Sequence, residues 1–303
     1  MYADKLRPHE VDNKRIVIST YQSLLNMDDD WFNSFNCVIV DEVHQYDSPT
    51  LKRMMEKTTK VKNKIGLTGS VKSGTLSKLT LKGLFGRHRK LISIEEAQDK
   101  KIIRKFEIKI LILKHDPIQW KMDYPTEKQF LFDADRRNDY IKNLLLSLKG
   151  NTINLFDKVD GHILPFHKYL QDHMPPDRDL HLVYGGVETD ERNEIRALTE
   201  GAENVIINAT YGTFSTGINI KRIRNIVLSS PTKSKIRILQ TFGRALRISE
   251  DYDIATMYDI ADDLRTTNFG NNITLNHLLE RVKLYNQENF PYKIYNIALN
   301  RKG

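Results

Sequence analysis

The chain has 303 residues, of which 40% are hydrophobic and 9% aromatic, and it carries a formal net charge of +8. This composition excludes a disordered chain or a coiled coil, and it can supply a packed core for each of two domains. The basic balance favours a polyanionic partner, but it does not by itself separate a nucleic-acid-binding protein from other basic proteins.

Short apolar runs alternate with longer amphipathic segments along the first part of the chain. We expect strands at residues 15–19, 36–40 and 64–68, and a helix at 50–60. Such alternation is typical of a parallel sheet with crossover helices. A doubly wound sheet normally has more strands than these three, so we expect this domain to be incomplete on its N-terminal side.

The second part of the chain repeats the alternation with more strands, which indicates a complete α/β domain. The helices expected there lie at 161–172, 189–199 and 234–246. The strands are expected at 152–156, 180–184, 205–209, 226–228 and 254–258.

Charged residues and prolines between these parts indicate the domain division. We expect a partial first domain at 1–95, a connector at 96–125 that contains a strand-like run at 106–113, and a second domain at 126–270. The remaining segment, 271–303, is expected to be a helical C-terminal extension.

The single cysteine, Cys37, lies in the apolar run 35–40. We interpret it as a small buried hydrophobic residue rather than a disulfide partner or a zinc ligand. The sequence has no apolar run long enough to cross a membrane and no signal-peptide core. We therefore expect a soluble, cytoplasmic protein without a membrane partner.

Two adjacent carboxylates, Asp41 and Glu42, come directly after the strand expected at 36–40. Open α/β sheets bind ligands at the carboxyl ends of their strands. At that place Asp41 can hold Mg²⁺ through water, and Glu42 can orient and deprotonate an attacking water molecule. Two acids after a strand also commonly serve as turn or capping residues, so the pair alone does not establish catalysis.

Two further motifs follow expected elements. Thr68 and Ser70 offer small hydroxyl groups at a turn, which can couple a nucleotide site to the other domain, although any strand can end in Thr-Gly-Ser. Arg244 and Arg247 stand three positions apart, on one helical face. Planar guanidinium groups stabilise charge on a transferring phosphoryl group, but an isolated arginine pair is more often solvated or ion-paired.

The order of the motifs is more informative than any one of them. The residues 41–44, 68–70 and 240–247 resemble motifs II, III and VI of superfamily 2 helicases. Three further stretches match the same pattern in their expected places, with 18–22 similar to motif Ib, 154–156 to motif IV and 208–219 to motif V.

Nearly the whole chain resembles the UvsW-like helicases of T-even-type bacteriophages, through residues 66–70, 84–86, 186–193, 211–217 and 233–236. The resemblance implies an α/β fold of two RecA-like lobes with parallel sheets, the first lobe being incomplete here. It also implies ATP hydrolysis with Mg²⁺ between the lobes, which drives unwinding of branched DNA and R-loops in phage recombination and repair. Such a protein would act in the cytoplasm of the host cell.

The resemblance also assigns roles to matching positions. The catalytic candidates are Asp41, Glu42, Arg244 and Arg247, and Asp41 is also the candidate for holding Mg²⁺ through water. The candidates for binding the nucleotide are His44, Gly217, Asn219 and Gln240. The candidates for binding the nucleic-acid backbone are Ser19, Thr20, Gln22, Thr210 and Thr213, and those for coupling the lobes are Thr68 and Ser70. Asn219 departs from the family, because many motif V sequences have aspartate there.

A larger departure concerns the phosphate-binding loop, Gly-x-x-x-x-Gly-Lys-Ser/Thr, with which such motors hold the β- and γ-phosphates. The sequence has no Gly-Lys pair, and we expect Met1 to fall inside the first lobe. Two interpretations remain open. The chain is either the C-terminal part of a motor that another chain completes with a phosphate loop, or a non-catalytic nucleic-acid-binding module derived from a helicase.

Overall fold

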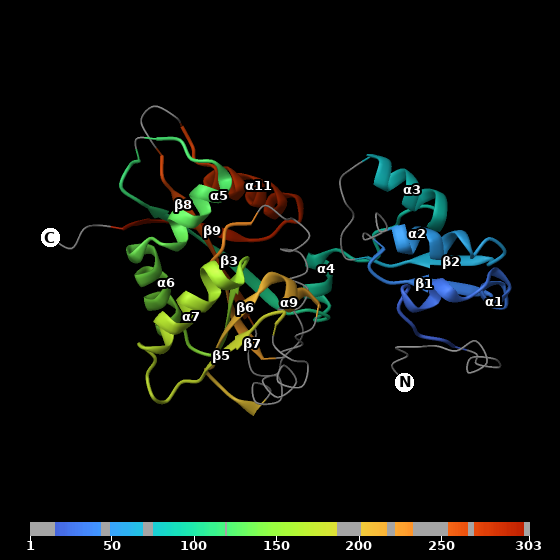
Figure 1. Ribbon diagram of the computed structural model, residues 1–303, viewed down its shortest axis with the longest axis horizontal. Helices are drawn as coiled ribbons and strands as arrows, with labels where there is room; N and C mark the ends of the chain where they lie inside the picture. Colours follow the sequence, from blue (N-terminus) through green and yellow to red (C-terminus); the bar gives the residue numbers. More distant parts are fainter. Residues whose placement is uncertain are drawn as a thin grey trace. The chain divides into compact units, whose positions relative to one another are not determined.

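The computed structural model describes residues 16–43, 49–68, 75–118, 120–186, 201–216, 222–232, 254–265 and 270–299. The chain divides into two compact units, Met1–Leu91 and Ile92–Gly303, and each contains a parallel β-sheet with helices (Figure 1). The predicted α/β fold class is therefore confirmed.

Unit 1 contains a two-stranded parallel sheet, in which β1 (Cys37–Val40) pairs with β2 (Asn63–Gly66). One face of this sheet packs against helices, because Val40 shares a core with Leu51 and Met55 of α2. The described helical elements of this unit are η2 (Ser23–Asn26), α1 (Asp29–Asn33), α2 (Pro49–Glu56) and α3 (Thr75–Phe85).

Gly66 allows α3 to approach β2 closely. A Cβ atom at this position would lie 2.9 Å from Cγ of Phe85 and 3.0 Å from Cγ1 of Val43. Both distances are shorter than normal van der Waals contact, and the ring of Phe85 is held among the buried apolar residues of this unit. The local packing therefore requires glycine at the end of β2.

Unit 2 contains a seven-stranded parallel sheet with the strand order β5-β6-β4-β7-β8-β3-β9. The strands are β3 (Lys105–Lys114), β4 (Asn151–Phe156), β5 (Leu180–Val183), β6 (Ile206–Thr210), β7 (Ile223–Leu228), β8 (Ile254–Asp263) and β9 (Tyr292–Ala298). The helices are α4 (Ile94–Asp99), α5 (Tyr124–Phe132), α6 (Asp135–Ser147), the π-helical η4 (Val159–Ile163), α7 (Leu164–Gln171), α9 (Tyr211–Thr216) and α11 (Ile273–Gln287).

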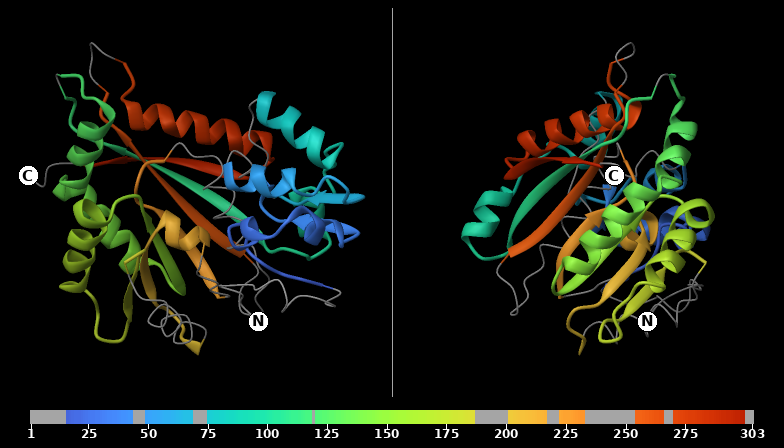
Figure 2. Two further views of the ribbon diagram at one scale, coloured as in Figure 1. Left: turned by 45° about the vertical axis from the view of Figure 1, so that its right-hand side comes forward. Right: turned by 90° about the vertical axis from the view of Figure 1, so that its left-hand side faces the viewer.

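Helices cover both faces of the large sheet, as the two views of Figure 2 show. Phe214 of α9 and Leu278 of α11 belong to the hydrophobic core on one face. Leu145 of α6 and Phe166 of α7 belong to the core on the other face. The interior strand β4 is consequently buried along its whole length, as is usual in a parallel sheet with helices on both faces.

The structure differs from the predicted domain organisation at two places. Residues 105–114, which we expected within a connector, form β3 and pair with β8 and β9 inside the large sheet. The expected helical extension contains α11 but ends in the strand β9. The strand-like run at 106–113 is confirmed as a strand. Its partner β8, like the partner β3 of β9, is distant in the sequence, so only long-range pairing places the two strands in this sheet.

Four local expectations also differ from the structure or lie outside the described residues. Residues 16–20 form no regular strand, and Cys37 is exposed rather than buried. Cys37 is exposed because it points to the face of the two-stranded sheet that α2 and α3 do not cover. The helices expected at 189–199 and 234–246 lie outside the described residues. Within the described parts of the chain, no helix is both long and apolar enough to span a bilayer.

The close contact at Gly66 gives a first prediction. Gly66→Ala should lower the free energy of unfolding of unit 1 by about 1–3 kcal/mol, because the added methyl group overlaps the ring of Phe85. The measurement is urea unfolding followed by the fluorescence of Trp31 in a Trp120→Phe background, since the chain has only two tryptophans. Gly83→Ala is the control, because an added Cβ meets nothing there and should stabilise the helix by up to about 1 kcal/mol. Equal effects of the two changes would contradict the packing argument.

Candidate functional site

The acid pair lies at the carboxyl end of β1, where the sequence predicted it. Asp41 is exposed, and one of its carboxylate oxygens accepts a hydrogen bond from the Glu42 backbone N–H at 2.8 Å. Glu42 is half-buried. The Asp41 carboxylate can also face water, which suits an indirect contact with a hydrated cation.

Glu42 has an unusual backbone conformation, with φ of 53°. This is the left-handed region, which costs an L-residue other than glycine roughly 1–2 kcal/mol. The conformation is kept in place by the next residue, because the Val43 N–H donates to the Leu67 carbonyl at 3.0 Å. Strained residues of this kind are concentrated at functional sites, so the conformation supports a role for Glu42 beyond ordinary turn formation.

The structure brings Thr68 next to the acid pair. Val40 pairs with Gly66 in the parallel register, so Asp41 and Thr68 follow the ends of neighbouring strands. Thr68 is half-buried. The three side chains therefore share one edge of the small sheet, while His44 and Ser70, which were predicted to act with them, lie outside the described residues.

Three predicted nucleic-acid contacts, Ser19, Thr20 and Gln22, surround the start of η2. Thr20 and Gln22 are exposed, and Ser19 is half-buried. The Thr20 Oγ1 lies 3.0 Å from the Ser23 Oγ and also accepts from the Ser23 N–H at 3.3 Å. This turn presents hydroxyl and amide groups to solvent, which are the groups that contact a sugar-phosphate backbone.

In unit 2, the predicted contacts Thr210 and Thr213 lie at the junction of β6 and α9. Both are buried, and their hydroxyl oxygens are 2.9 Å apart. One hydroxyl therefore donates to the other, and the structure does not present either to solvent. Five other predicted residues of this unit lie outside the described residues: Gly217, Asn219, Gln240, Arg244 and Arg247.

A chain of polar side chains crosses the centre of the large sheet. The Asn154 Nδ2 donates to the Asn208 Oδ1 at 3.0 Å, and the Ser229 hydroxyl donates to the Asn154 Oδ1. The far end of this chain is the Asn208 amide, which lies 3.1 Å from the Nδ1 of His167. Burial lowers the pKa of His167, and the nearby His181 lowers it further, so a neutral ring is favoured.

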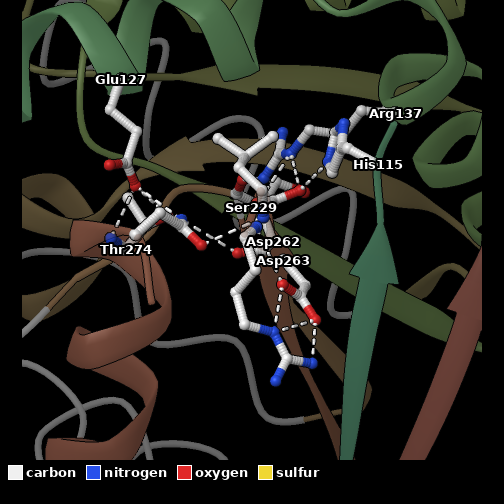
Figure 3. A network of polar contacts seen from close by, with 10 residues as sticks. His115, Glu127, Arg137, Ser229, Asp262, Asp263 and Thr274 are labelled. Atoms are coloured by element: carbon white, nitrogen blue, oxygen red, sulfur yellow. Dashed lines mark hydrogen bonds and ion pairs between the residues drawn. The ribbon is translucent and has the colours of Figure 1, made fainter. Parts of the chain in front are cut away.

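The carboxyl end of β8 carries a buried ion pair (Figure 3). The Nε of Arg137, on α6, lies 2.9 and 3.0 Å from the two carboxylate oxygens of Asp262, and both side chains are fully buried. The Nε2 of His115 lies 2.9 Å from the same carboxylate. Burial opposes the ionisation of Asp262, but the charge of Arg137 and the hydrogen bond from His115 hold its pKa below the ordinary value.

A second buried ion pair lies three residues earlier on β8. The Arg281 Nε, on α11, donates to the Asp259 Oδ2 at 2.9 Å, and the Tyr285 hydroxyl donates to the same oxygen at 2.7 Å. Burial works against the charge of Arg281, but Asp259 beside it raises the pKa of this arginine. Burial and the same carboxylate raise the pKa of Tyr285 well above its ordinary value, so the hydroxyl stays protonated.

The buried carboxylate of Glu127, on α5, caps the N-terminus of α11 (Figure 3). It accepts hydrogen bonds from the backbone N–H groups of Ile273 and Thr274 at 2.9 and 2.7 Å, and from the Thr274 hydroxyl at 2.6 Å. The two backbone N–H groups have no carbonyl partner inside the helix, and the helix dipole favours a negative charge at this end. Glu127 therefore ties α5 to α11.

Within the described residues, no group of three or more His, Cys, Asp or Glu side chains could hold a metal ion. A divalent cation beside Asp41 would then be held by one carboxylate together with water and substrate oxygens, which is usual for Mg²⁺. The residues present fit such a cation, because the Asp41 carboxylate is exposed at a strand end.

Comparison with known proteins matches both units. Residues 2–73 match the family described as the type III restriction enzyme res subunit, and residues 136–249 match the helicase conserved C-terminal domain. The ATP-dependent DNA helicase UvsW of Enterobacteria phage T4 is 28% identical over 298 residues, which cover 94% of this chain and 59% of that protein. The chain is a homologue of the UvsW helicase and is similar to superfamily 2 helicases in both units.

Solved structures agree with this assignment. The crystal structure of T4 UvsW matches with a TM-score of 0.56 and 26% identity, over 96% of this chain and 60% of that chain. The restriction-modification enzyme LlaBIII bound to DNA has the same fold, with a TM-score of 0.64 and 15% identity, over 92% of this chain and 23% of that one. The chain thus spans about three fifths of the length of the UvsW protein that it matches.

The sequence of this helicase homologue gave no indication of the two ion pairs on β8. Arg137 is 125 residues from Asp262, and Arg281 is 22 residues from Asp259. The charged residues look like ordinary surface positions of a helix and a strand. The one available signal was Asp262-Asp263 at the end of an apolar strand run, since acids at the end of an interior strand require a partner.

The ion pair at Asp262 gives a second prediction. Asp262→Asn should lower the melting temperature of unit 2 by roughly 6–20 °C, because losing one partner of a buried pair costs about 3–5 kcal/mol. Calorimetry can follow unit 2 as the transition of larger enthalpy, since enthalpy scales with size. The folded-state pKa of Asp262 is depressed, so its contribution is present above an unfolded pKa of about 3.9 and is lost as the pH falls further. The difference between variant and wild type should therefore shrink below about pH 4.

Asp263→Asn is the matched control for this experiment. The partner of Asp263 is Arg265, whose side chain is 55% exposed, so no buried charge is stranded by the change. A similar loss for both variants would show that burial of the Arg137 charge is not the cause.

Proposed function

We propose that the chain is part of an ATP-dependent DNA helicase of the UvsW type, in which units 1 and 2 are the two motor lobes. The observation that carries the proposal is the similarity to UvsW, which runs through both units in the same order over 94% of this chain. The positions of Asp41, Glu42 and Thr68 at one sheet edge support it. Branched DNA and R-loops, in phage recombination and repair, are the proposed substrates and process.

ATP and Mg²⁺ are the proposed cofactors, and when bound they supply the transferable phosphoryl group and a cation that neutralises its charge. Asp41 would hold the cation through water. Glu42 would accept a proton from the attacking water, and its constrained backbone would fix the direction of its carboxylate. Arg244 and Arg247 are proposed to stabilise the negative charge of the transition state.

The proposed contacts with DNA are sequence-independent. Ser19, Thr20 and Gln22 would donate to phosphate oxygens from the exposed turn at η2. Thr210 and Thr213 would do so only after their mutual hydrogen bond opens, because both are buried in the structure.

Among the described residues of unit 1, no helix covers the face of the small sheet opposite α2 and α3, and we call it the bare face; it supports a role for a further segment in completing the motor. Parallel sheets are normally covered on both faces, yet Ile39 and Ile65 on this face are 63% and 45% exposed. Cys37 and Asp41 lie on the same face by the alternation of the strand. We propose that a segment carrying the phosphate-binding loop packs here, which would bring the loop to the end of β1 where Asp41 lies.

The second candidate function is a nucleic-acid-binding module without hydrolysis. It is favoured by one observation, the absence of a Gly-Lys pair from the 303 residues. The two candidates differ in what they require of Glu42, because a binding module needs no residue that activates water.

The third prediction separates these candidates. In DNA-stimulated ATP hydrolysis, Glu42→Gln should abolish turnover and leave DNA affinity within about twofold, because it removes only the proton acceptor. Hydrolysis is measured for the 303-residue chain alone and together with the part of T4 UvsW that the chain does not match. Glu56→Gln, an exposed acid on α2, is the control. Hydrolysis that survives Glu42→Gln refutes the catalytic role, and DNA binding without hydrolysis in either mixture supports the binding module.

The fourth prediction uses the single cysteine as a reporter of the bare face. Adding the same UvsW segment should slow alkylation of Cys37 at least about tenfold, because the segment buries an apolar face on which this exposed thiol lies. Ile65→Glu should restore the fast rate, since it places a charge in the contact. Ile294→Glu, at an exposed apolar position of unit 2, is the control that should leave the protection unchanged. An unchanged alkylation rate on mixing would place the segment elsewhere.

A further inference from the structure

The backbone that follows β7 is held by side chains from four different elements. The Ser229 carbonyl accepts from the Arg137 Nη2 at 2.6 Å, and the Ser230 carbonyl accepts from the Tyr211 hydroxyl at 2.9 Å. The two carbonyls after them are held in the same way: that of Pro231 accepts from Tyr124 at 3.4 Å and that of Thr232 from the Arg281 Nη1 at 2.8 Å. We call residues Ser229–Thr232 the carbonyl run.

The two arginine donors are themselves fixed by the ion pairs on β8. Asp262 holds Arg137, and Asp259 holds Arg281. Residues an odd number of positions apart on a strand point to opposite faces of the sheet. The carbonyl run, which follows the neighbouring strand β7, is therefore held from both faces at once.

The side chain of Ser230 also helps to hold the carbonyl run in place. Its Oγ accepts a hydrogen bond from the Asp157 N–H at 3.0 Å and lies 2.9 Å from the Nδ1 of His162. Burial, and then the charges of Arg137 and Lys128, lower the pKa of His162 well below its ordinary value, so this ring stays neutral. The carbonyl run is fully buried and has little freedom to move unless a donor moves with it.

Tyr211 is the donor that leads to the predicted nucleic-acid contacts. It is the first residue of α9, directly after Thr210 and two positions before Thr213. Its side chain is 2% exposed. A displacement of α9 would therefore be passed through the Tyr211 hydroxyl to the Ser230 carbonyl.

The carbonyl run also precedes the proposed arginines in the chain, since Arg244 follows Thr232 by 12 positions. We propose that Tyr211 is a positioning residue that couples nucleic-acid binding at Thr210 and Thr213 to the carbonyl run, and so to the start of the segment that carries Arg244 and Arg247. This inference rests on the proposed function. Arg137 and Arg281 hold the carbonyl run with and without bound nucleic acid, and Tyr211 is the donor that responds to the nucleic acid.

The test compares Tyr211→Phe with Tyr169→Phe. Both changes remove one hydrogen-bonded hydroxyl, but the Tyr169 hydroxyl bonds to Asp139 and Lys142 on α6, away from the carbonyl run. The first measurement is amide hydrogen exchange of the peptide containing residues 229–232 in the 303-residue chain, with and without single-stranded DNA. Wild type and Tyr169→Phe should exchange at least about fivefold more slowly with DNA, and Tyr211→Phe should show a change of less than about twofold, because a neutral hydrogen bond is worth about 1 kcal/mol.

The second measurement is DNA stimulation of ATP hydrolysis, in whichever mixture shows hydrolysis that depends on Glu42. Tyr211→Phe should reduce the stimulation at least about fivefold while the basal kcat, the KM for ATP and the DNA affinity stay within about twofold. A merely structural role would instead lower basal activity and the melting temperature together, and that result would overturn the proposal.

The outcomes distinguish a failure of the proposed function from a failure of the coupling through Tyr211. No DNA binding by the wild type would refute the proposed function itself. DNA binding with equal protection of residues 229–232 in wild type and Tyr211→Phe would leave the proposed function in place and refute the coupling.

Discussion

A charge buried in a protein interior has to be neutralised where it lies, and strand β8 buries two carboxylates. Desolvation of one ion costs several kcal/mol, so Asp259 and Asp262 are tolerable only with Arg281 and Arg137 held against them. The two aspartates point to opposite faces of the large sheet. They therefore fix the position of one helix on each face, α11 and α6, more strictly than the non-directional packing of the apolar side chains alone.

The two units differ in how the polar side chains at the carboxyl ends of their strands are used. In unit 2, the polar groups at this edge are engaged with one another, as Thr210 is with Thr213 and Arg137 with Asp262. In unit 1, by contrast, Asp41 remains exposed and Glu42 has a strained backbone. The first arrangement is suited to holding backbone segments in place, and the second to contact with water and a ligand.

The small sheet of unit 1 also illustrates how parallel sheets depend on what covers them. Val40 lies in a core under α2, whereas Ile39, the preceding residue, is 63% exposed. A two-stranded parallel sheet offers too little buried area to be stable by itself, because its free energy comes mainly from the apolar surface removed from water on both faces. The bare face and the exposed Asp41 are next to each other for this reason, since both belong to the part of the sheet that α2 and α3 leave uncovered.

The sequence by itself determined the α/β class, most of the strands and the acid pair, because hydrophobic periodicity and residues at strand ends are local properties of the chain. It also determined the superfamily 2 resemblance, since the order of the motifs can be recognised without knowledge of the fold. Only the tertiary structure decided that residues 105–114 are an interior strand, that Cys37 is exposed, and that Thr210 and Thr213 are buried. Only the tertiary structure also identified the partners of Asp262 and of the carbonyl run. Arg137 and Tyr211 come from other segments of the chain, and nothing in the sequence indicates that these segments are in contact.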